Sequence, residues 1–292
     1  MKSQIRKIVN LFGISILVAT QSSCARNQHT EFINFPDHNG EREIVIMTAS
    51  YNNKDWYRWS LDSIFAQQYQ NYRVIYVDDF STDGTADLVE SYVKEKGQEH
   101  RFTLIRNTEH KGAVANHYHA IHTCDDRAII AIVDGDDGIS SPYVLQFLNQ
   151  IYADNNVWLT YGQFIEYPTG IRGFCQDMPH YVVANNSFRD FIDIPSHMRT
   201  FYAGLYKQIK KEDLMLNGEF LVMLADIAAM FPMIEMARYH FKFIPEILYI
   251  YNAANVINDH KVSKTLQRGL DLMVRARPRY AQVESPLTPV QS

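Results

Sequence analysis

Three carboxylates follow an apolar run of mostly β-branched residues. The run from residue 129 to residue 133 leads directly into Asp134, Gly135, Asp136 and Asp137. A buried strand with this ending presents its acids at the carboxyl edge of a sheet, where open α/β folds bind ligands. Neighbouring carboxylates repel one another unless a cation lies among them, and Mg²⁺ or Mn²⁺ beside a phosphate-bearing ligand suits such oxygen ligands. The pattern predicts a divalent-cation site, with an ordinary polar loop as the alternative.

Two earlier predicted strands also end in polar loops. Residues 72–77 run into an acidic turn at 78–85, and residues 43–48 break into the polar stretch 49–53. Apolar residues at helical spacing over 53–68 separate the two strands. Right-handed crossovers bring the carboxyl ends of parallel strands to one edge. We therefore expect an α/β fold with a mostly parallel, Rossmann-like sheet flanked by helices.

The motifs occur in an order and spacing that resemble the inverting GT-A glycosyltransferases of family two. The matching stretches are residues 44–52, residues 77–85, Asn107 with Lys111, Gly112 and Asn116, and residues 134–137. The resemblance implies a single GT-A domain at 42–275, with nucleotide-sugar binding at 42–165 and the acceptor side at 166–275. It also implies a hexosyltransferase that moves one sugar, with inversion, from a nucleotide-diphosphate sugar to an acceptor hydroxyl. UDP-sugar is the default donor, and Mn²⁺ or Mg²⁺ would assist.

The expected nucleotide-binding residues come from the ends of the first two strands and the start of the next helix. They are Thr48, Ser50, Tyr51, Asp79, Lys111 and Asn116. The first strand end offers backbone and an aromatic surface to a base, and the resemblance favours Asp79 as the acceptor of a base N–H. Lys111 begins a helical stretch, so a cation and backbone amides would point toward phosphate or base. A solvated lysine at a helix start is the alternative for Lys111.

The acids after the third strand are expected to divide their roles. Within the resemblance, Asp136 is the first metal ligand with Asp137 beside it, and Asp134 contacts the ribose or the donor sugar. His260 would close over the metal or the diphosphate, a surface histidine being the alternative. Relatives often carry Trp after the last acid, whereas this chain has Gly138. That departure concerns the floor of the acceptor site.

A single carboxylate, Asp226, interrupts the apolar stretch at 220–232. Burial of a lone carboxylate is costly unless it has a partner or a task, and a helix-capping role is the alternative. The resemblance implies that Asp226 is the base that deprotonates the acceptor hydroxyl, although Ala225 stands where relatives frequently have an acid. His197 and Arg199 are expected in an acceptor-side loop.

Composition fits one folded domain that does not bind nucleic acid. The 292 residues are 46% hydrophobic, which suffices for one sizeable core. The net charge of −5 leaves no basic footprint for nucleic acid. Prolines at 286 and 289 predict a flexible tail at 276–292. The resemblance, in turn, implies a nucleotide-sugar donor and a glycan, lipid or protein acceptor as partners.

The N-terminus has the layout of an export signal. Lys2, Arg6 and Lys7 precede an apolar stretch at 8–19, which as a helix reaches only ~18 Å, short of a ~30 Å membrane core. This layout, with Cys24 at a lipoprotein-like processing site, predicts a signal peptide or membrane anchor at 1–24 and a linker at 25–41. The expected location is membrane-associated or exported. A tether with a cytoplasmic-facing domain is the alternative, because bacterial nucleotide sugars are kept in the cytoplasm.

Three alternatives to sugar transfer are a zinc site, a nucleotidyltransferase and an inactive binding protein. His117, His119, His122 and Cys124 suggest zinc, but His117 faces away from the other two histidines on a helix. A nucleotidyltransferase would carry a glycine-rich, basic loop where this chain has residues 50–53. A catalytically inactive, exported nucleotide-sugar or glycan binding protein stays open.

Overall fold

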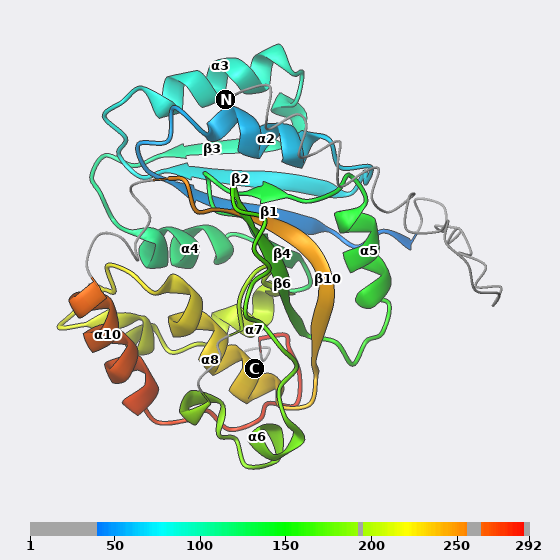
Figure 1. Ribbon diagram of the computed structural model, residues 1–292, viewed down its shortest axis with the longest axis vertical. Helices are drawn as coiled ribbons and strands as arrows, with labels where there is room; N and C mark the ends of the chain where they lie inside the picture. Colours follow the sequence, from blue (N-terminus) through cyan, green and yellow to red (C-terminus); the bar gives the residue numbers. More distant parts are fainter. Residues whose placement is uncertain (1–39, 192–194, 256–263, 289–292) are drawn as a thin grey trace.

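A computed structural model describes residues 40–191, 195–255 and 264–288, and its centre is an eight-stranded sheet (Figure 1). The strand order is β3-β2-β1-β4-β7-β6-β10-β5. The strands are β1 (Ile44–Ser50), β2 (Tyr72–Asp78), β3 (Phe102–Arg106), β4 (Ile129–Ile132), β5 (Gly138–Ile139), β6 (Leu159–Tyr167), β7 (Thr200–Tyr202) and β10 (Phe241–Asn252). A separate hairpin pairs β8 (Met215–Leu216) with β9 (Glu219–Phe220).

The first half of the sheet is parallel, as the polar strand ends predicted. Ile44 of β1 lies opposite Tyr72 of β2 and Ile129 of β4, so the three strands end near one edge. The second half is mixed, because β7 runs antiparallel between β4 and β6, and β5 runs antiparallel along β10. The mostly parallel α/β fold is confirmed. The acidic segment 134–137 leaves β4 at the shared edge.

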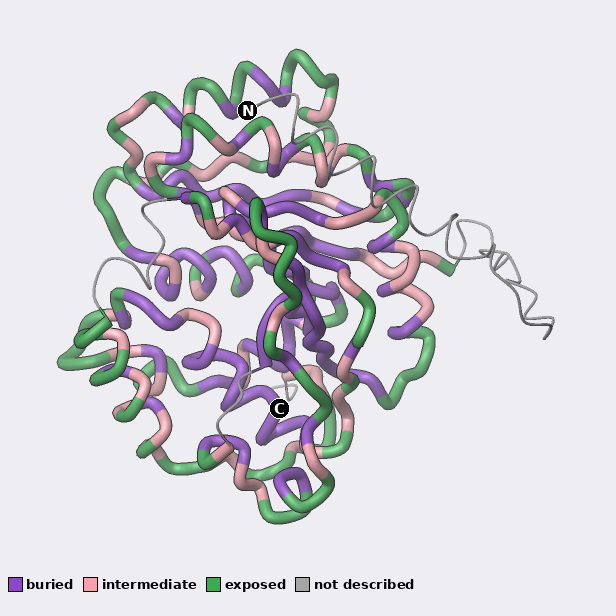
Figure 2. The backbone as a smooth tube through the Cα atoms, in the orientation of Figure 1, coloured by how far each residue is buried: buried purple, intermediate pink, exposed green. Residues whose placement is uncertain are grey.

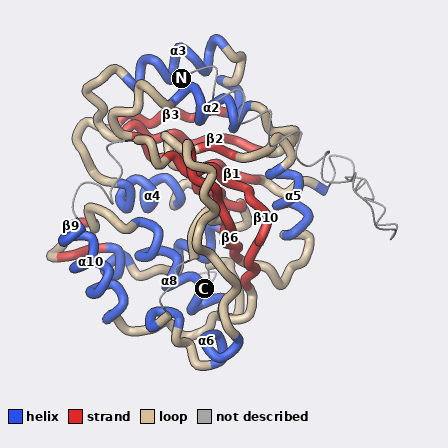
Figure 3. The backbone as a smooth tube through the Cα atoms, in the orientation of Figure 1, coloured by secondary structure: helices blue, strands red, loops and turns tan. Residues whose placement is uncertain are grey.

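Helices cover both faces of the sheet, as Figures 1 and 3 show. One face carries α2 (Tyr57–Phe65), α3 (Thr85–Glu95) and α5 (Val144–Ile151), and the other carries α4 (Ala113–Ile121), α7 (Ala203–Lys207) and α8 (Ala225–Ala237). Further helical segments are α6 (His180–Ala184), α10 (Lys264–Ala276) and the 3-10 turns η2 (Glu99–Arg101), η3 (Phe188–Asp190) and η4 (Lys211–Leu214).

Side chains that alternate in direction along the strands produce two hydrophobic cores, one on each face of the sheet. In β1, Ile44 and Ile46 pack with α2, α3 and α5, whereas Val45 and Met47 pack with α4 and α8. Side chains on a strand point alternately to opposite faces, so a continuous apolar run serves both layers. Figure 2 shows the resulting buried sheet between its covering helices.

A buried ion pair fixes α8 in the second layer. Arg189 of η3 donates from Nε to Glu235 Oε1 at 2.6 Å and from Nη2 to Oε2 at 2.8 Å. Its Nη1 donates to the carbonyl of Val274 in α10 at 2.7 Å. The two charged side chains are 1% and 0% exposed. This bidentate ion pair therefore connects η3, α8 and α10, and α8 is the helix that carries Asp226.

The C-terminal segment 277–288 lies along this layer. Val283 N–H donates to the carbonyl of Met236 at 3.0 Å, and Thr288 N–H donates to Asp126 Oδ2 at 3.0 Å. A Cβ on Gly204 would lie 2.7 Å from the Pro286 carbonyl, so the segment needs glycine there. The sequence predicted a flexible tail from residue 276. In the structure the described part of that tail is held by hydrogen bonds to α8 and to the loop before β4.

The predicted leader at 1–24 and linker at 25–41 lie almost wholly outside the described residues. Within the described ranges, no helix has both the length and the apolar character needed to cross a membrane.

Candidate active site

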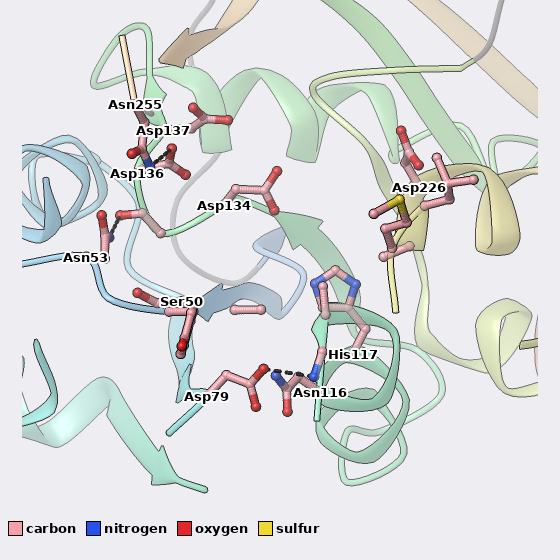
Figure 4. A pocket seen from close by; sticks show the side chains of 18 of the residues that line it. Ser50, Asn53, Asp79, Asn116, His117, Asp134, Asp136, Asp137, Asp226 and Asn255 are labelled. Carbon is pink, nitrogen blue, oxygen red and sulfur yellow. Dashed lines mark hydrogen bonds between the residues drawn. The ribbon is translucent and has the colours of Figure 1, made fainter. Parts of the chain in front are cut away.

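A cleft of about 600 Å³ opens at the carboxyl edge of the parallel strands (Figure 4). Its walls come from the loops after β1, β2 and β4, the start of α4, the segment before β7 and the start of α8. The cleft brings together seven of the residues predicted for the site: Ser50, Tyr51, Asp79, Asn116, Asp134, Asp136 and Asp137. Asp226 completes the opposite wall.

Asp79 organises the nucleotide end of the cleft. Its carboxylate accepts hydrogen bonds from the backbone N–H groups of Lys111 and Gly112, both at 2.8 Å, and from Asn107 Nδ2 at 2.7 Å. Burial alone would raise the pKa of Asp79, but these donors lower it below its ordinary value. The predicted base acceptor thus also holds the start of α4 in place. Its contact with a base stays a prediction.

Two predicted nucleotide residues do not offer side chains to the cleft. Thr48 is fully buried, and among the described residues its hydroxyl has no hydrogen-bond partner. Lys111 is exposed to solvent and does not line the cleft. Its backbone N–H donates a hydrogen bond to Asp79. Tyr51 does line the cleft, 41% exposed, with its ring centroid 4.5 Å from that of His110. These two rings form an aromatic wall.

The acidic loop after β4 is built from long-range contacts. Asp137 is 1% exposed and accepts hydrogen bonds from Tyr249 Oη at 2.8 Å and from Asn252 N–H at 2.7 Å. Asp136 accepts from Asn255 Nδ2 at 2.7 Å. Burial raises the pKa of Asp137 well above its ordinary value, and the charges of Asp136 and Asp134 raise it further. The loop is therefore a cluster of like charges that a cation would stabilise.

Small residues let this loop pack against β1 and α2. A Cβ on Gly135 would lie 2.7 Å from Cβ of Ser50, so only glycine fits at the strand end. Asn53 donates from Nδ2 to the Gly135 carbonyl, a contact that the sequence did not reveal. At Gly138, a Cβ would lie 3.2 Å from Cζ2 of Trp59 in α2. An indole from α2 therefore occupies the space beside Gly138, the position at which the family resemblance led us to expect Trp.

Carboxylates in this loop fit a divalent cation better than the nearby histidine does. Asp134, Asp137 and His197 each offer a ligand atom, all within 4.8 Å of one another. However, His197 Nδ1 lies 3.2 Å from Nη2 of Arg199, which can only donate, so that nitrogen already accepts a hydrogen bond from the guanidinium. Burial and then the Arg199 charge hold the pKa of His197 well below its ordinary value. The predicted ligand His260 lies outside the described residues.

Arg199 lies between the acidic loop and α8. Its Nη2 is 3.4 Å from Asp134 Oδ2, and its Nη1 is 3.9 Å from Asp226 Oδ2. Burial lowers the pKa of Arg199, but the carboxylates of Asp134 and Asp226 raise it overall, so the guanidinium stays charged. The sequence named Arg199 only as an acceptor-side contact. Its two carboxylate neighbours are 65 and 27 residues away in sequence, which no local pattern reveals.

Asp226 lies on the opposite wall of the cleft from the acidic loop (Figure 4). It is the second residue of α8, with a side chain 27% exposed, and its Oδ1 accepts from Ile227 N–H at 2.8 Å. The sequence suggested a lone buried carboxylate. The structure corrects this, because Asp226 is partly exposed and has Arg199 beside it. The cap position of α8 belongs to Leu224, so the capping alternative does not describe Asp226.

The zinc alternative finds no support in the part of the chain that the structure describes. The histidines of α4 and Cys124 form no common ligand group there. His117 instead lines the cleft, buried and neutral, because burial and the Arg199 charge lower its pKa to about 3. His119 and His122 pack against Tyr118.

The sequence model of Glycosyl transferase family 2 matches residues 45–208, more than half of the chain. The chain belongs to this family. UDP-Glc:alpha-D-GlcNAc-diphosphoundecaprenol beta-1,3-glucosyltransferase WfaP from Escherichia coli is 34% identical over 94 residues, which are 32% of this chain and 35% of that protein. The chain spans about a third of the length of the curated relatives that it matches in this way.

Two solved structures have the same fold as this family member. Staphylococcus aureus TarS 1–349, in complex with UDP-GlcNAc, aligns with a TM-score of 0.57 at 17% identity, covering 80% of this chain and 66% of that chain. Mannosyltransferase PcManGT from Pyrobaculum calidifontis, in complex with GDP-Man and Mn²⁺, aligns with a TM-score of 0.52 at 18% identity, covering 93% and 74%. The GT-A architecture predicted from the motifs is thereby confirmed.

Proposed function

We propose that this protein transfers one sugar from a nucleotide-diphosphate sugar to an acceptor hydroxyl, with inversion at the sugar carbon. The observation that carries the proposal is the placement of Asp226 across one cleft from the acidic loop Asp134, Asp136 and Asp137. Family membership and the UDP-GlcNAc and GDP-Man complexes of the two structural neighbours support it.

Asp226 is the proposed base. Its carboxylate takes the proton of the acceptor hydroxyl while the hydroxyl oxygen attacks the anomeric carbon. Attack comes from the face opposite the diphosphate, so a new C–O bond forms as the bond to the diphosphate oxygen breaks. Partial exposure of Asp226, at 27%, leaves this carboxylate open to an acceptor.

The acidic loop is proposed to hold the donor's diphosphate through a divalent cation, Mn²⁺ or Mg²⁺. Asp136 and Asp134 are the proposed ligands, since Asp137 is buried behind them and bonded to Tyr249 and Asn252. When bound, the cation would neutralise the departing nucleoside diphosphate. The base is proposed to lie against the aromatic wall of Tyr51 and His110, near Asp79.

Calorimetry of the full chain with UDP and with GDP, each with and without Mn²⁺, tests the donor site. We expect one nucleotide to bind in a Mn²⁺-dependent manner and Asp136→Ala to abolish that binding. Failure of both nucleotides to bind would contradict the proposal. Nucleotide binding with no release of sugar from any donor would favour the inactive binding protein instead.

We also propose that residues 1–24 direct the protein to a membrane or out of the cytoplasm. Support comes from the basic start, the apolar stretch at 8–19 and Cys24. Fractionation of cells that express the full chain or Cys24→Ala tests this. Recovery of the unaltered chain in the cytosolic fraction would contradict it.

A further inference from the structure

His117 is a residue of the cleft for which the proposed reaction has no role so far. It belongs to α4, is 6% exposed, and directs its ring into the cleft (Figure 4). Its Nε2 is buried and has no hydrogen-bond partner in the described part of the chain. Most buried polar atoms in folded proteins are paired, because an unpaired one costs free energy. An unpaired imidazole in a cleft wall is therefore suited to bind a ligand.

The ring lies on the side of the cleft where an acceptor would bind. The charges of Arg199 and Asp226 act on its pKa, and Asp226 is the one described carboxylate that does so. Around Asp226 the cleft lining is apolar and consists of Val222, Met223, Leu224 and Ala225. His117 is therefore an uncharged hydrogen-bonding group within electrostatic reach of the proposed base.

The protonation state of His117 limits what the ring can do. Burial and then the Arg199 charge lower its pKa to about 3, so it cannot serve as a second base at neutral pH. A neutral imidazole has one N–H and one lone pair. Because Nε2 has no partner among the described residues, no contact there fixes which nitrogen carries the proton. The ring can therefore present either a donor or an acceptor to a ligand.

A hydroxyl other than the attacking one suits this ring best. The attacking hydroxyl has one proton, which the proposed mechanism gives to Asp226. An N–H donated to its oxygen would withdraw electron density from the atom that attacks. A neighbouring hydroxyl has no such task, so it can donate to His117 or accept from it. An acceptor with one isolated hydroxyl, such as a serine side chain, would cover the ring and leave it unpaired.

We propose that the acceptor carries two adjacent hydroxyl groups, one of which gives its proton to Asp226 while His117 binds the other. A sugar ring and an open-chain polyol both supply such a pair. This inference rests on the proposed function, because Asp226 is the base in both. His117 is thus a specificity-determining residue that favours glycans and polyols over protein side chains and lipid alcohols.

Acceptor probes that differ by one hydroxyl test the inference on the full chain with Mn²⁺ and a donor that it uses. The matched pair is trans-cyclohexane-1,2-diol and cyclohexanol. A site that binds a hydroxyl discriminates against the analogue that lacks it, so we expect kcat/KM for the diol to be higher by about tenfold or more. Equal values for the two probes would overturn the proposal.

Further probes identify the source of the hydroxyl pair. Transfer to methyl glucoside would support a sugar ring, and transfer to sorbitol would support an open-chain polyol. Transfer to a serine-containing peptide but to none of the diol probes would overturn the inference. The proposed function would then still hold, since it fails on a different result, the absence of nucleotide binding.

Substitutions of His117 separate acceptor recognition from folding. His117→Phe keeps a ring and removes both hydrogen-bonding atoms, so kcat/KM for the diol and for cyclohexanol should become equal within about twofold. His117→Gln retains a donor and an acceptor and should recover part of the preference. Thermal unfolding of both variants shows whether the fold is kept. A preference for the diol that persists in His117→Phe would overturn the assignment, and so would equal losses of kcat/KM for the two probes.

Discussion

Two arginines in this protein are buried to nearly the same extent but are paired very differently. Arg189 binds both oxygens of Glu235 at 2.6 and 2.8 Å and adds a carbonyl at 2.7 Å. Arg199 has two carboxylates near it, but the closest approach is 3.4 Å. The first pair lies between helices, whereas the second lines the cleft. Tight pairing fixes the scaffold, and loose pairing leaves donors for a ligand.

The largest expected effect concerns the tight pair. Glu235→Gln should lower the free energy of unfolding by about 3–5 kcal/mol, because it leaves the buried Arg189 charge without its carboxylate. Chemical denaturation of the variant and the unaltered chain measures this. A loss below about 1 kcal/mol would mean that the geometry of the pair does not report its contribution to stability.

Asp226→Asn changes a residue of the cleft, and its effect should be on activity and not on stability. We expect donor turnover to fall by about a hundredfold or more, because the amide cannot accept the acceptor's proton. Stability should change little, since the side chain is partly exposed. Turnover assays beside thermal unfolding separate the two effects. Retained turnover would remove Asp226 from its proposed role as base.

The free energy of unfolding should fall at acidic pH because of His117, which lies near the Arg199 charge. Burial and the Arg199 charge lower the pKa of His117 to about 3, so the folded protein keeps this ring neutral where the unfolded chain would protonate it. The stability that His117 contributes is present above its unfolded pKa, about 6.5, and is lost as the pH falls toward the folded value. By pH 5 the loss should reach about 2 kcal/mol.

His117→Asn tests this dependence. Its unfolding free energy should fall less steeply with pH between about 6.5 and 4.5 than that of the unaltered chain. His122→Asn, at the exposed C-cap of the same helix, is the matched control. Parallel pH curves for all three proteins would show that His117 is protonated equally in both states.

The smallest effect is expected for the stability of Arg199→Met. Its carboxylate neighbours are 36% and 27% exposed and can be solvated when the guanidinium is removed. The free energy of unfolding should therefore change by less than about 1 kcal/mol. Chemical denaturation of Arg199→Met and Glu235→Gln under the same conditions compares their free energies of unfolding directly. Equal losses in the two variants would remove the distinction between a scaffold arginine and a cleft arginine.

Local sequence pattern was sufficient for the parallel half of the fold and for the acids at its edge. Each strand there is an apolar run with a polar ending, so Asp79 and Asp134 could be placed before any contact was known. The antiparallel insertion of β7 was not foreseen, because three residues carry little periodicity. Thr48 and Lys111 were assigned to the cleft from their positions at element ends, although side-chain direction decides what a residue lines.

The pairings that complete the cleft could not be predicted from sequence. Tyr249 donates to Asp137 across 112 positions, and Arg199 reaches Asp134 across 65. Such contacts depend on how β4, β10 and the segment before β7 are arranged in the tertiary structure. No local sequence pattern predicts that arrangement.

The indole of Trp59 beside Gly138 limits which side chains position 138 can carry. The chain has Gly138 after the acids, and the indole of Trp59 occupies the neighbouring volume from a different part of the chain. Placing Trp at position 138 alone would put two large rings in the space of one. A large side chain at position 138 therefore requires a smaller residue at position 59.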